Sequence, residues 1–166
     1  MAREENIAAQ EKFAEGVVSG NLDVIAEVMA PDVVDHDPAP FQGPGPQGFK
    51  DFFSTMRSAF PNMNIEPEHM TATDDDVAIA YTLTGTHEGE FQGVAPTGKT
   101  ISVRGVQIAR FNEDARIVER WGSSDELCIL QQLNAMEIKG EGQEEDKGFV
   151  DKVKDAFSGE ENREGR

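Results

Sequence analysis

The sequence predicts an α+β fold in which helices cover one face of a curled, antiparallel or mixed sheet. Three observations support this prediction. Apolar residues recur at helical spacing through the first 60 residues, they alternate with polar residues from Asn64 to Ser123, and a short helical pattern follows. With 166 residues, 37% of them hydrophobic and ten of them phenylalanine, the chain is long enough to bury one core.

The N-terminal part of the chain predicts three helices. Two of them lie within residues 7–29 and are separated at Ser19-Gly20-Asn21, where glycine ends the first helix and asparagine can cap the second. Pro31 is expected to end the second helix, and residues 32–37 form a short extended piece. Phenylalanines spaced by three or four residues over 49–60 predict the third helix.

The remainder of the domain predicts a meander of four strands. Alternating patterns cover residues 64–73, 77–87, 101–111 and 116–123, and polar turns separate them. A last helix is predicted over residues 126–136. Helices followed by a meander give a sheet with its helices on one face.

The end of the chain differs in composition from the rest. Residues 137–166 are polar, glycine-rich and acidic, which favours disorder. We therefore predict one domain over residues 1–136 and a disordered acidic tail over residues 137–166.

The charge excludes several classes of partner. Thirty-two acidic against fifteen basic residues give a formal net charge of -17, which repels nucleic acid and anionic membranes. The acidic residues are dispersed, and lysines are few, which is typical of proteins from salt-rich cytoplasms. A very soluble mesophilic protein is the alternative.

Other features indicate a cytoplasmic protein. The N-terminus lacks the basic start and apolar core of a signal peptide, and no apolar stretch approaches the roughly 20 residues of a membrane span. The single cysteine, Cys128, excludes an internal disulfide and lies in an apolar run, so we expect it to be buried and unreactive.

A glycine-rich motif precedes the third helix. Gly43, Gly45 and Gly48 spell the G-x-G-x-x-G of dinucleotide-binding proteins. Pro44 and Pro46 remove amide donors that would face a pyrophosphate, and no strand of a βαβ unit leads into the motif. The motif therefore does not predict a nucleotide cofactor.

Two histidines are candidates for a site. His36 lies between Asp35 and Asp37, but only the two aspartates share a side of an extended chain, so a metal site is not predicted. His36 can instead be a pocket imidazole with a raised pKa, or a polar residue at a strand end. His87 is the last residue of a predicted strand, before the loop at 88–100. A role in the site and a structural role are equally compatible with this position.

Asp125 is the strongest candidate for a catalytic carboxylate. It stands where a strand ends and a helix begins, four residues after Trp121, and a neighbouring tryptophan can raise the pKa of a carboxyl toward that of a general base. The stretch Ser123-Ser124-Asp125-Glu126 also contains a capping box, so Asp125 can simply stabilise the helix N-terminus.

Five segments resemble the SnoaL-like polyketide cyclase, or ester cyclase, family of the nuclear-transport-factor-2-like superfamily. The resemblance runs from about residue 4 to residue 134, and the segments that carry it read VDHDP (34–38), GPQGFKDFF (45–53), AFPN (59–62), THEGEFQGVAPTGKTISVRG (86–105) and IVERWGSSDELCILQQL (117–133). The resemblance implies a cone-shaped α+β barrel, commonly a dimer packed through the outer sheet face. It also implies an intramolecular aldol cyclisation that needs no metal or organic cofactor.

The resemblance also implies which residues form the site. It assigns the proton-accepting role to Asp125. Residues expected to line or shape the pocket are His36, His87, Phe53, Arg104, Gln107 and Trp121. Arg104 and Gln107 have opposite strand parity, so both face inward only if Gly105 marks a bulge.

Together these features predict a protein that binds a small, apolar, carbonyl-bearing molecule. In the leading hypothesis Asp125 is the base, and His36 or His87 holds the developing enolate oxygen. A hydrolase or dehydratase would need a second acid, Asp35 or Asp37, in the same cavity, and a non-catalytic binding or dimerisation module is the third possibility. A buried Asp125 near either histidine favours an enzyme, whereas an exposed Asp125 that caps the helix favours a binding module.

Overall fold

The computed structural model describes residues 2–135 of the chain. Its elements follow the predicted order, with helices and strands bounded as α1 Ala2–Ser19, α2 Val24–Val28, β1 Met29–Asp35, α3 Gly45–Ala59, β2 Asn64–Ala72, β3 Asp76–Thr86, β4 Thr100–Phe111, β5 Ile117–Ser124 and α4 Glu126–Gln132. The predicted acidic tail lies outside the described residues. Pro31 lies inside β1 and does not end α2, and a proline is tolerated there because β1 is an edge strand.

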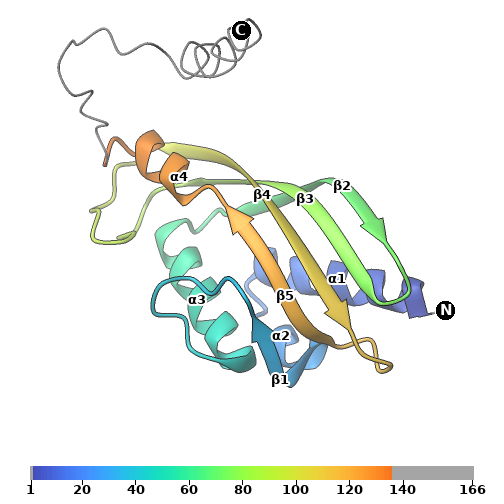
Figure 1. The fold of residues 1–166 in the computed structure, drawn as a ribbon. Coiled ribbons are helices and arrows are strands. Elements are labelled where there is room, and N and C mark those ends of the chain that lie inside the picture. The colour runs from blue at the N-terminus through green and yellow to red at the C-terminus, as the bar shows by residue number, and fades with distance from the viewer. Residues whose placement is uncertain (1, 136–166) are drawn as a thin grey trace, which may run out of the picture. The chain divides into compact units, whose positions relative to one another are not determined.

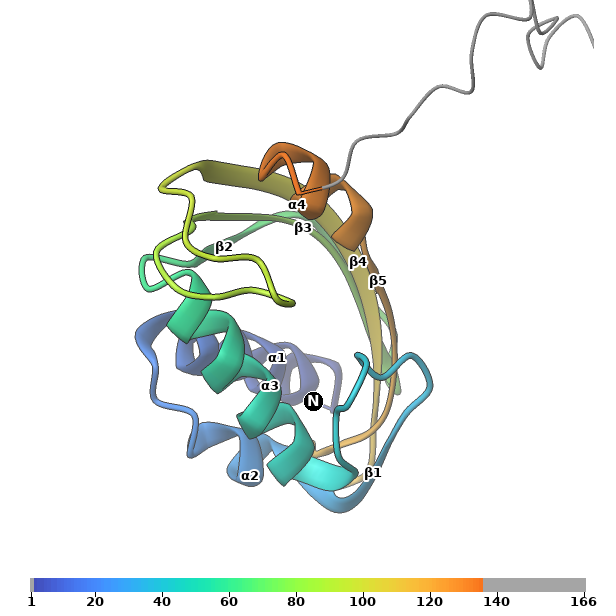
Figure 2. The ribbon, with the colours of Figure 1, turned by 90° about the vertical axis from the view of Figure 1, so that its left-hand side faces the viewer.

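The five strands form one open, mixed sheet in the order β1-β5-β4-β3-β2 (Figure 1). β1 runs parallel to β5, and the other neighbours are antiparallel. The sheet curls around α1 and α3, so that it has a concave side covered by helices and an outer side without them (Figure 2). The predicted fold class is confirmed, with a sheet that is curled but not closed.

Strand alternation decides which residues reach the core. In β4 every second residue is buried, from Ile101 to Phe111, and the residues between them are exposed. These buried residues meet apolar side chains of the helices on the concave side. The core that they form includes Phe13, Ile25, Phe49, Phe60, Val103, Phe111 and Ile117. A ligand site on this side therefore requires a place where the apolar core leaves a cavity.

The helices and the single cysteine bear on two further expectations. Within residues 2–135, the helices are all too short or too polar to cross a membrane. Cys128 packs against the core but is only half-buried, and its Sγ accepts a hydrogen bond from Gln132 Nε2 at 3.0 Å.

Candidate functional site

A pocket opens on the concave side, between α3, the segment after β1 and the end of β5. Its volume is about 190 Å³. The rings of Phe49, Phe52 and Phe53 form an apolar wall, and Arg120 and Gly122 also line the pocket. The rim is formed by Asp37, Pro38, Ala39, Pro40, Gln42, Ser123, Ser124 and Glu126. An apolar wall beside a cation suits a small molecule that carries an oxygen group.

Arg120 is held by the buried carboxylate of Asp35. Its Nη1 donates to both oxygens of Asp35 at 3.1 and 3.2 Å, and the side chains are 19% and 7% exposed. Gln42 Nε2 donates to the same carboxylate at 3.0 Å, and the guanidinium lies 5.9 Å from the ring centre of Phe49. This network fixes the cation against the apolar wall.

The glycine-rich motif shapes the loop that borders the pocket. A side chain at Gly48 would bring its Cβ to 1.7 Å from the carbonyl oxygen of Gly43, so the two backbones approach as only glycine allows. Pro44 precedes α3, and Pro46 occupies its first turn. The glycines therefore serve a tight entry into α3, which carries the phenylalanine wall.

Gln107 and Phe53, both expected in the pocket, lie on the concave side. Gln107 is 8% exposed, and its Oε1 lies 3.5 Å from Arg120 Nε. Phe53 lines the pocket and makes edge contacts with the rings of Phe13 and Phe52.

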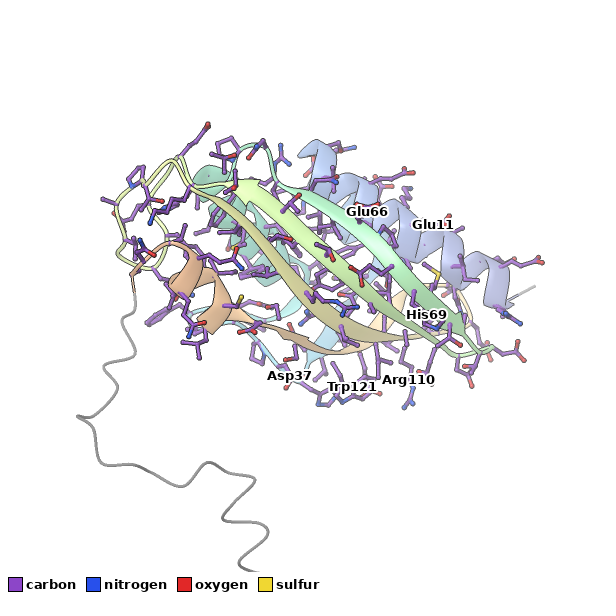
Figure 3. The ribbon with its side chains drawn as sticks, turned by 90° about the horizontal axis from the view of Figure 1, so that it is seen from above. Glu11, Asp37, Glu66, His69, Arg110 and Trp121 are labelled. Carbon is purple, nitrogen blue, oxygen red and sulfur yellow. The ribbon has the colours of Figure 1, made fainter. Side chains whose placement is uncertain are left out.

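His36 and Trp121 lie together on the outer side of the sheet. Their rings are stacked, with centres 4.7 Å apart and planes 5° apart, and His36 Nε2 lies 2.9 Å from Glu119 Oε2. Arg110 stands 5.4 Å from the centre of the Trp121 ring, and Figure 3 shows the two side chains beside each other. This group does not reach the concave pocket, because neighbouring residues of a strand point to opposite faces.

Arg104 also projects outward. The pairing of β4 with β3 continues in regular register through Gly105, so the bulge that would turn Arg104 inward is absent from the described sheet. Arg104 pairs with Glu68 on β2, which also accepts a hydrogen bond from Thr82. These two hydrogen bonds, Thr82's first, hold the pKa of Glu68 below its ordinary value.

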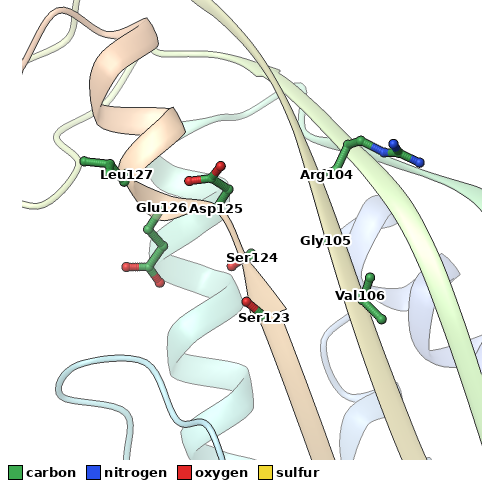
Figure 4. Close-up of a pocket in the computed structure, with 8 residues that line it drawn as sticks. All are labelled: Arg104, Gly105, Val106, Ser123, Ser124, Asp125, Glu126 and Leu127. Atoms are coloured by element: carbon green, nitrogen blue, oxygen red, sulfur yellow. The ribbon is translucent and has the colours of Figure 1, made fainter. Parts of the chain in front are cut away.

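Asp125 is exposed and caps α4, with its Oδ1 accepting from Cys128 N at 2.9 Å. It borders a larger, open hollow of about 600 Å³ on the outer side, where β5 leaves β4 (Figure 4). Glu126 borders both this hollow and the concave pocket, and the two carboxylates leave the start of α4 in different directions. We take the concave pocket as the site although it is smaller, because there a fixed cation lies beside an apolar wall.

His87 is fully buried at the end of β3. Its Nδ1 accepts a hydrogen bond from Thr97 N at 3.2 Å, which leaves the ring proton on Nε2 in the neutral form. Within residues 2–135, His87 Nε2 has no hydrogen-bond partner, and the ring packs 5.4 Å from that of Phe60. The histidine fastens the loop that follows β3.

The structure thus separates the expected site residues into four places. Phe53 and Gln107 lie on the concave side, Asp125 lies at the rim of the outer hollow, and His87 is enclosed in the core. His36, Trp121 and Arg104 are on the outer face. Sequence reasoning missed Arg120. Its side chain points to the face opposite to that of Trp121, and this alternation along the strand could have indicated it.

Comparisons with known proteins give the family. The family model described as SnoaL-like polyketide cyclase matches residues 7–133. A second model, described as the chaperone protein DnaJ C-terminal region, matches only residues 129–159, most of which the structure does not describe. No curated protein is significantly similar to this chain.

Solved structures agree with the first family model. IdmH from Streptomyces antibioticus, a candidate polyketide cyclase, is 30% identical over 78% of this chain and 98% of its own, with a TM-score of 0.68. AclR from Streptomyces galilaeus, a candidate hydroxylase, is 26% identical over 81% and 99%, with a TM-score of 0.71. A candidate polyketide cyclase from Acidithiobacillus ferrooxidans is 27% identical over 79% and 95%, with a TM-score of 0.67. This chain belongs to the SnoaL-like polyketide cyclase family.

Proposed function

We propose that this protein catalyses proton transfer at an activated carbon of a small, largely apolar, carbonyl-bearing molecule bound in the concave pocket. The reaction is of the cyclase type. A carboxylate removes a proton from a carbon beside two carbonyls, and the resulting enolate attacks a further carbonyl of the same molecule. The new alkoxide then takes up a proton, so that the substrate is isomerised without a change in oxidation state.

One observation carries this proposal: a fixed cation lies beside the aromatic wall of the pocket. The position of Arg120 is fixed, because its Nη1 donates to the two carboxylate oxygens of Asp35 at 3.1 and 3.2 Å. A carbonyl oxygen near this cation becomes more electrophilic, and an enolate oxygen is stabilised there. The rings of Phe49, Phe52 and Phe53 favour an apolar ligand body.

The base is one of the two carboxylates at the start of α4. The family resemblance favours Asp125, although its exposure and its capping of α4 are what we expected of a binding module. The geometry favours Glu126, which borders the concave pocket and accepts from Gln92 Nε2 at 3.3 Å. His36 and His87 are not part of this proposal, because one faces outward and the other is enclosed.

The test is hydrogen exchange at the acidic carbon of a cyclic β-keto ester, followed by NMR in D₂O at mildly acidic pD. Asp125→Asn keeps the cap, and Glu126→Gln keeps the shape, so each removes only the ability to accept a proton. We expect one of them to lower the catalysed exchange rate by about 100-fold or more and the other to leave it within a few-fold. If both retain the full rate, or if the parent protein does not accelerate exchange, the proposal fails.

A second candidate function is addition or removal of water. The carboxylate of Asp37 borders the same pocket, where it accepts a hydrogen bond from Gly122 N at 3.0 Å and could orient a water molecule. Incorporation of ¹⁸O from labelled water into a product would favour this function over cyclisation.

We also propose that two copies pair through the outer face of the sheet. Val34, Val106 and Ile108 are 48%, 52% and 39% exposed there, beside the stacked rings of His36 and Trp121. An exposed apolar patch on a sheet face is a common binding surface. Sedimentation velocity of the whole chain tests whether the particle is a dimer.

A further inference from the structure

We propose that the Tyr81 hydroxyl and Arg120 Nη2 together form an oxyanion-binding site on the concave floor of the sheet. The site takes one carbonyl, enolate or carboxylate oxygen of the ligand. Its catalytic meaning rests on the proposed function, whereas the binding of an oxyanion does not.

Tyr81 lies on the concave face of a central strand. Its side chain points to the same face of the sheet as those of Ile79 and Leu83, which are buried. Tyr81 pairs directly with Gly105 of β4. The side chain is nevertheless half-buried rather than enclosed.

Two glycines make room for the two donors. A Cβ at Gly105 would lie 2.4 Å from both Cζ and the hydroxyl oxygen of Tyr81, so the phenol lies flat against this strand. A Cβ at Gly122 would lie 2.4 Å from Arg120 Nη2, so the guanidinium lies in the same way against β5. The two glycines are on neighbouring strands, and both follow the concave parity, since Gly122 pairs with the inward Gln107.

The two donors are also left without acceptors. Among residues 2–135, none hydrogen bonds to the Tyr81 hydroxyl, and Arg120 uses Nη1 for Asp35 and Nε for a long contact with Gln107. A partly buried donor without a partner favours a ligand that supplies an acceptor, because leaving it unpaired costs free energy. Arg120 Nη2 and the phenol therefore select an oxygen that carries negative charge.

The electrostatics agree with this geometry. Burial raises the pKa of Tyr81, and the positive charge of Arg120 acts in the opposite direction. The phenol remains protonated, and so remains a donor, at physiological pH. Asp35 takes up the Nη1 side of the guanidinium and leaves Nη2 for the ligand.

The test uses the fact that Tyr81 is the only tyrosine of the chain, so tyrosinate absorbance near 295 nm reports on it alone. The probe is cyclohexanecarboxylate, which combines an apolar ring with an oxyanion and does not absorb at this wavelength. We expect it to raise the titration midpoint of Tyr81, since a hydroxyl that donates to an anion is harder to deprotonate. Cyclohexylmethanol, which lacks the charge, should leave the midpoint in place.

Variants locate the effect. By calorimetry, Tyr81→Phe should weaken binding of the carboxylate about tenfold, as loss of a charge-assisted hydrogen bond predicts. Gly105→Ala displaces the phenol without removing it and should abolish the shift of the Tyr81 titration. Thr84→Ala, on the outer face of the same strand, is the matched control and should bind as the parent protein does.

Three results would overturn the inference. They are no binding of the carboxylate at tens of millimolar, binding without a change in the Tyr81 titration, and equal affinity of Tyr81→Phe and the parent protein. The outcomes separate this inference from the proposed function. Exchange of the β-keto ester that is insensitive to Tyr81→Phe would retain the function and remove the catalytic role of the oxyanion site, whereas Tyr81-dependent binding without exchange would retain only the site.

Discussion

Two pairs of side chains link the end of β1 to β5, and each residue of one pair is the chain neighbour of a residue of the other. The two pairs differ in the face of the sheet, in exposure and in the kind of contact. Asp35 and Arg120 meet on the concave side in a nearly buried ion pair. Their neighbours His36 and Trp121 meet on the outer side in a stacked, half-exposed pair. A step of one residue along paired strands thus moves a contact from the pocket to the surface.

The comparison separates chemistry from assembly. On the concave side, the low exposure strengthens the ion pair and makes a missing partner costly. On the outer side, solvent weakens the contacts of His36 with Glu119 and of Arg110 with Asp76, and apolar side chains of the same face are exposed. The proposed ligand chemistry thus involves the inner pair, and the proposed pairing of copies involves the outer pair.

The largest expected effect breaks the inner pair. Asp35→Asn should lower the free energy of unfolding by about 3 kcal/mol, because it leaves Arg120 without its counter-charge in a poorly hydrated place. Glu119→Gln removes the matching outer carboxylate and should cost less than about 1 kcal/mol. Urea unfolding of both variants checks this, and equal losses would contradict the assignment.

The next prediction concerns the outer face. Ile108→Glu should weaken dimerisation by tenfold or more, since it places a charge in the centre of the apolar patch, and it should leave carboxylate binding on the concave side unchanged. Sedimentation velocity over a range of concentrations measures the first effect, and calorimetry measures the second. A variant that keeps the parent's oligomeric state would remove this face as the interface.

A smaller effect is expected from the pH dependence of stability. The folded-state pKa of Tyr81 is raised by burial, so its contribution is fully present below the unfolded pKa near 10 and is lost as the pH rises through the folded value. Tyr81→Phe should therefore flatten the decline of stability above about pH 10. Thermal melts between pH 8 and pH 11 test the sign, and an unchanged slope in the variant would contradict it.

Salt should have the mildest effect. Because the net charge is -17, screening should relieve self-repulsion and raise the melting temperature as potassium chloride increases. A protein adapted to a salt-rich cytoplasm should continue to gain stability above about 1 M, where screening alone has nearly saturated. A plateau near 1 M would leave an acidic protein with ordinary screening, and a flat response throughout would exclude the halophilic interpretation.

The fold was predictable from the sequence because its signals are local. Alternation from Asn64 onward and helical spacing before it correctly indicated the order of the elements. Their bounds differed at Pro31, which lies inside edge strand β1, and at α4, which ends at Gln132. The site was less predictable, because it depends on which face each residue takes once the strands pair. The parity of Arg104 and Gln107 was read correctly as conflicting, but the sequence could not exclude a bulge at Gly105.

Arg120 and Tyr81 escaped sequence reasoning for the same reason. Each is a single polar residue among strand residues, and only the pairing of β3, β4 and β5 brings them to adjacent glycines. Trp121 attracted attention by its size, although its neighbour is the residue that enters the pocket. Size and residue type are visible in a sequence, whereas the shared face of two strands is not.

The most direct test of the proposed concave site is a crystal structure of the protein soaked with cyclohexanecarboxylate. We expect the ring against Phe49 and Phe53 and the carboxylate within hydrogen-bond distance of Arg120 Nη2 and the Tyr81 hydroxyl. A ligand bound in the outer hollow beside Asp125 and Leu127, with the concave pocket empty, would contradict the claim that the inner pair of β1 and β5 marks the functional face.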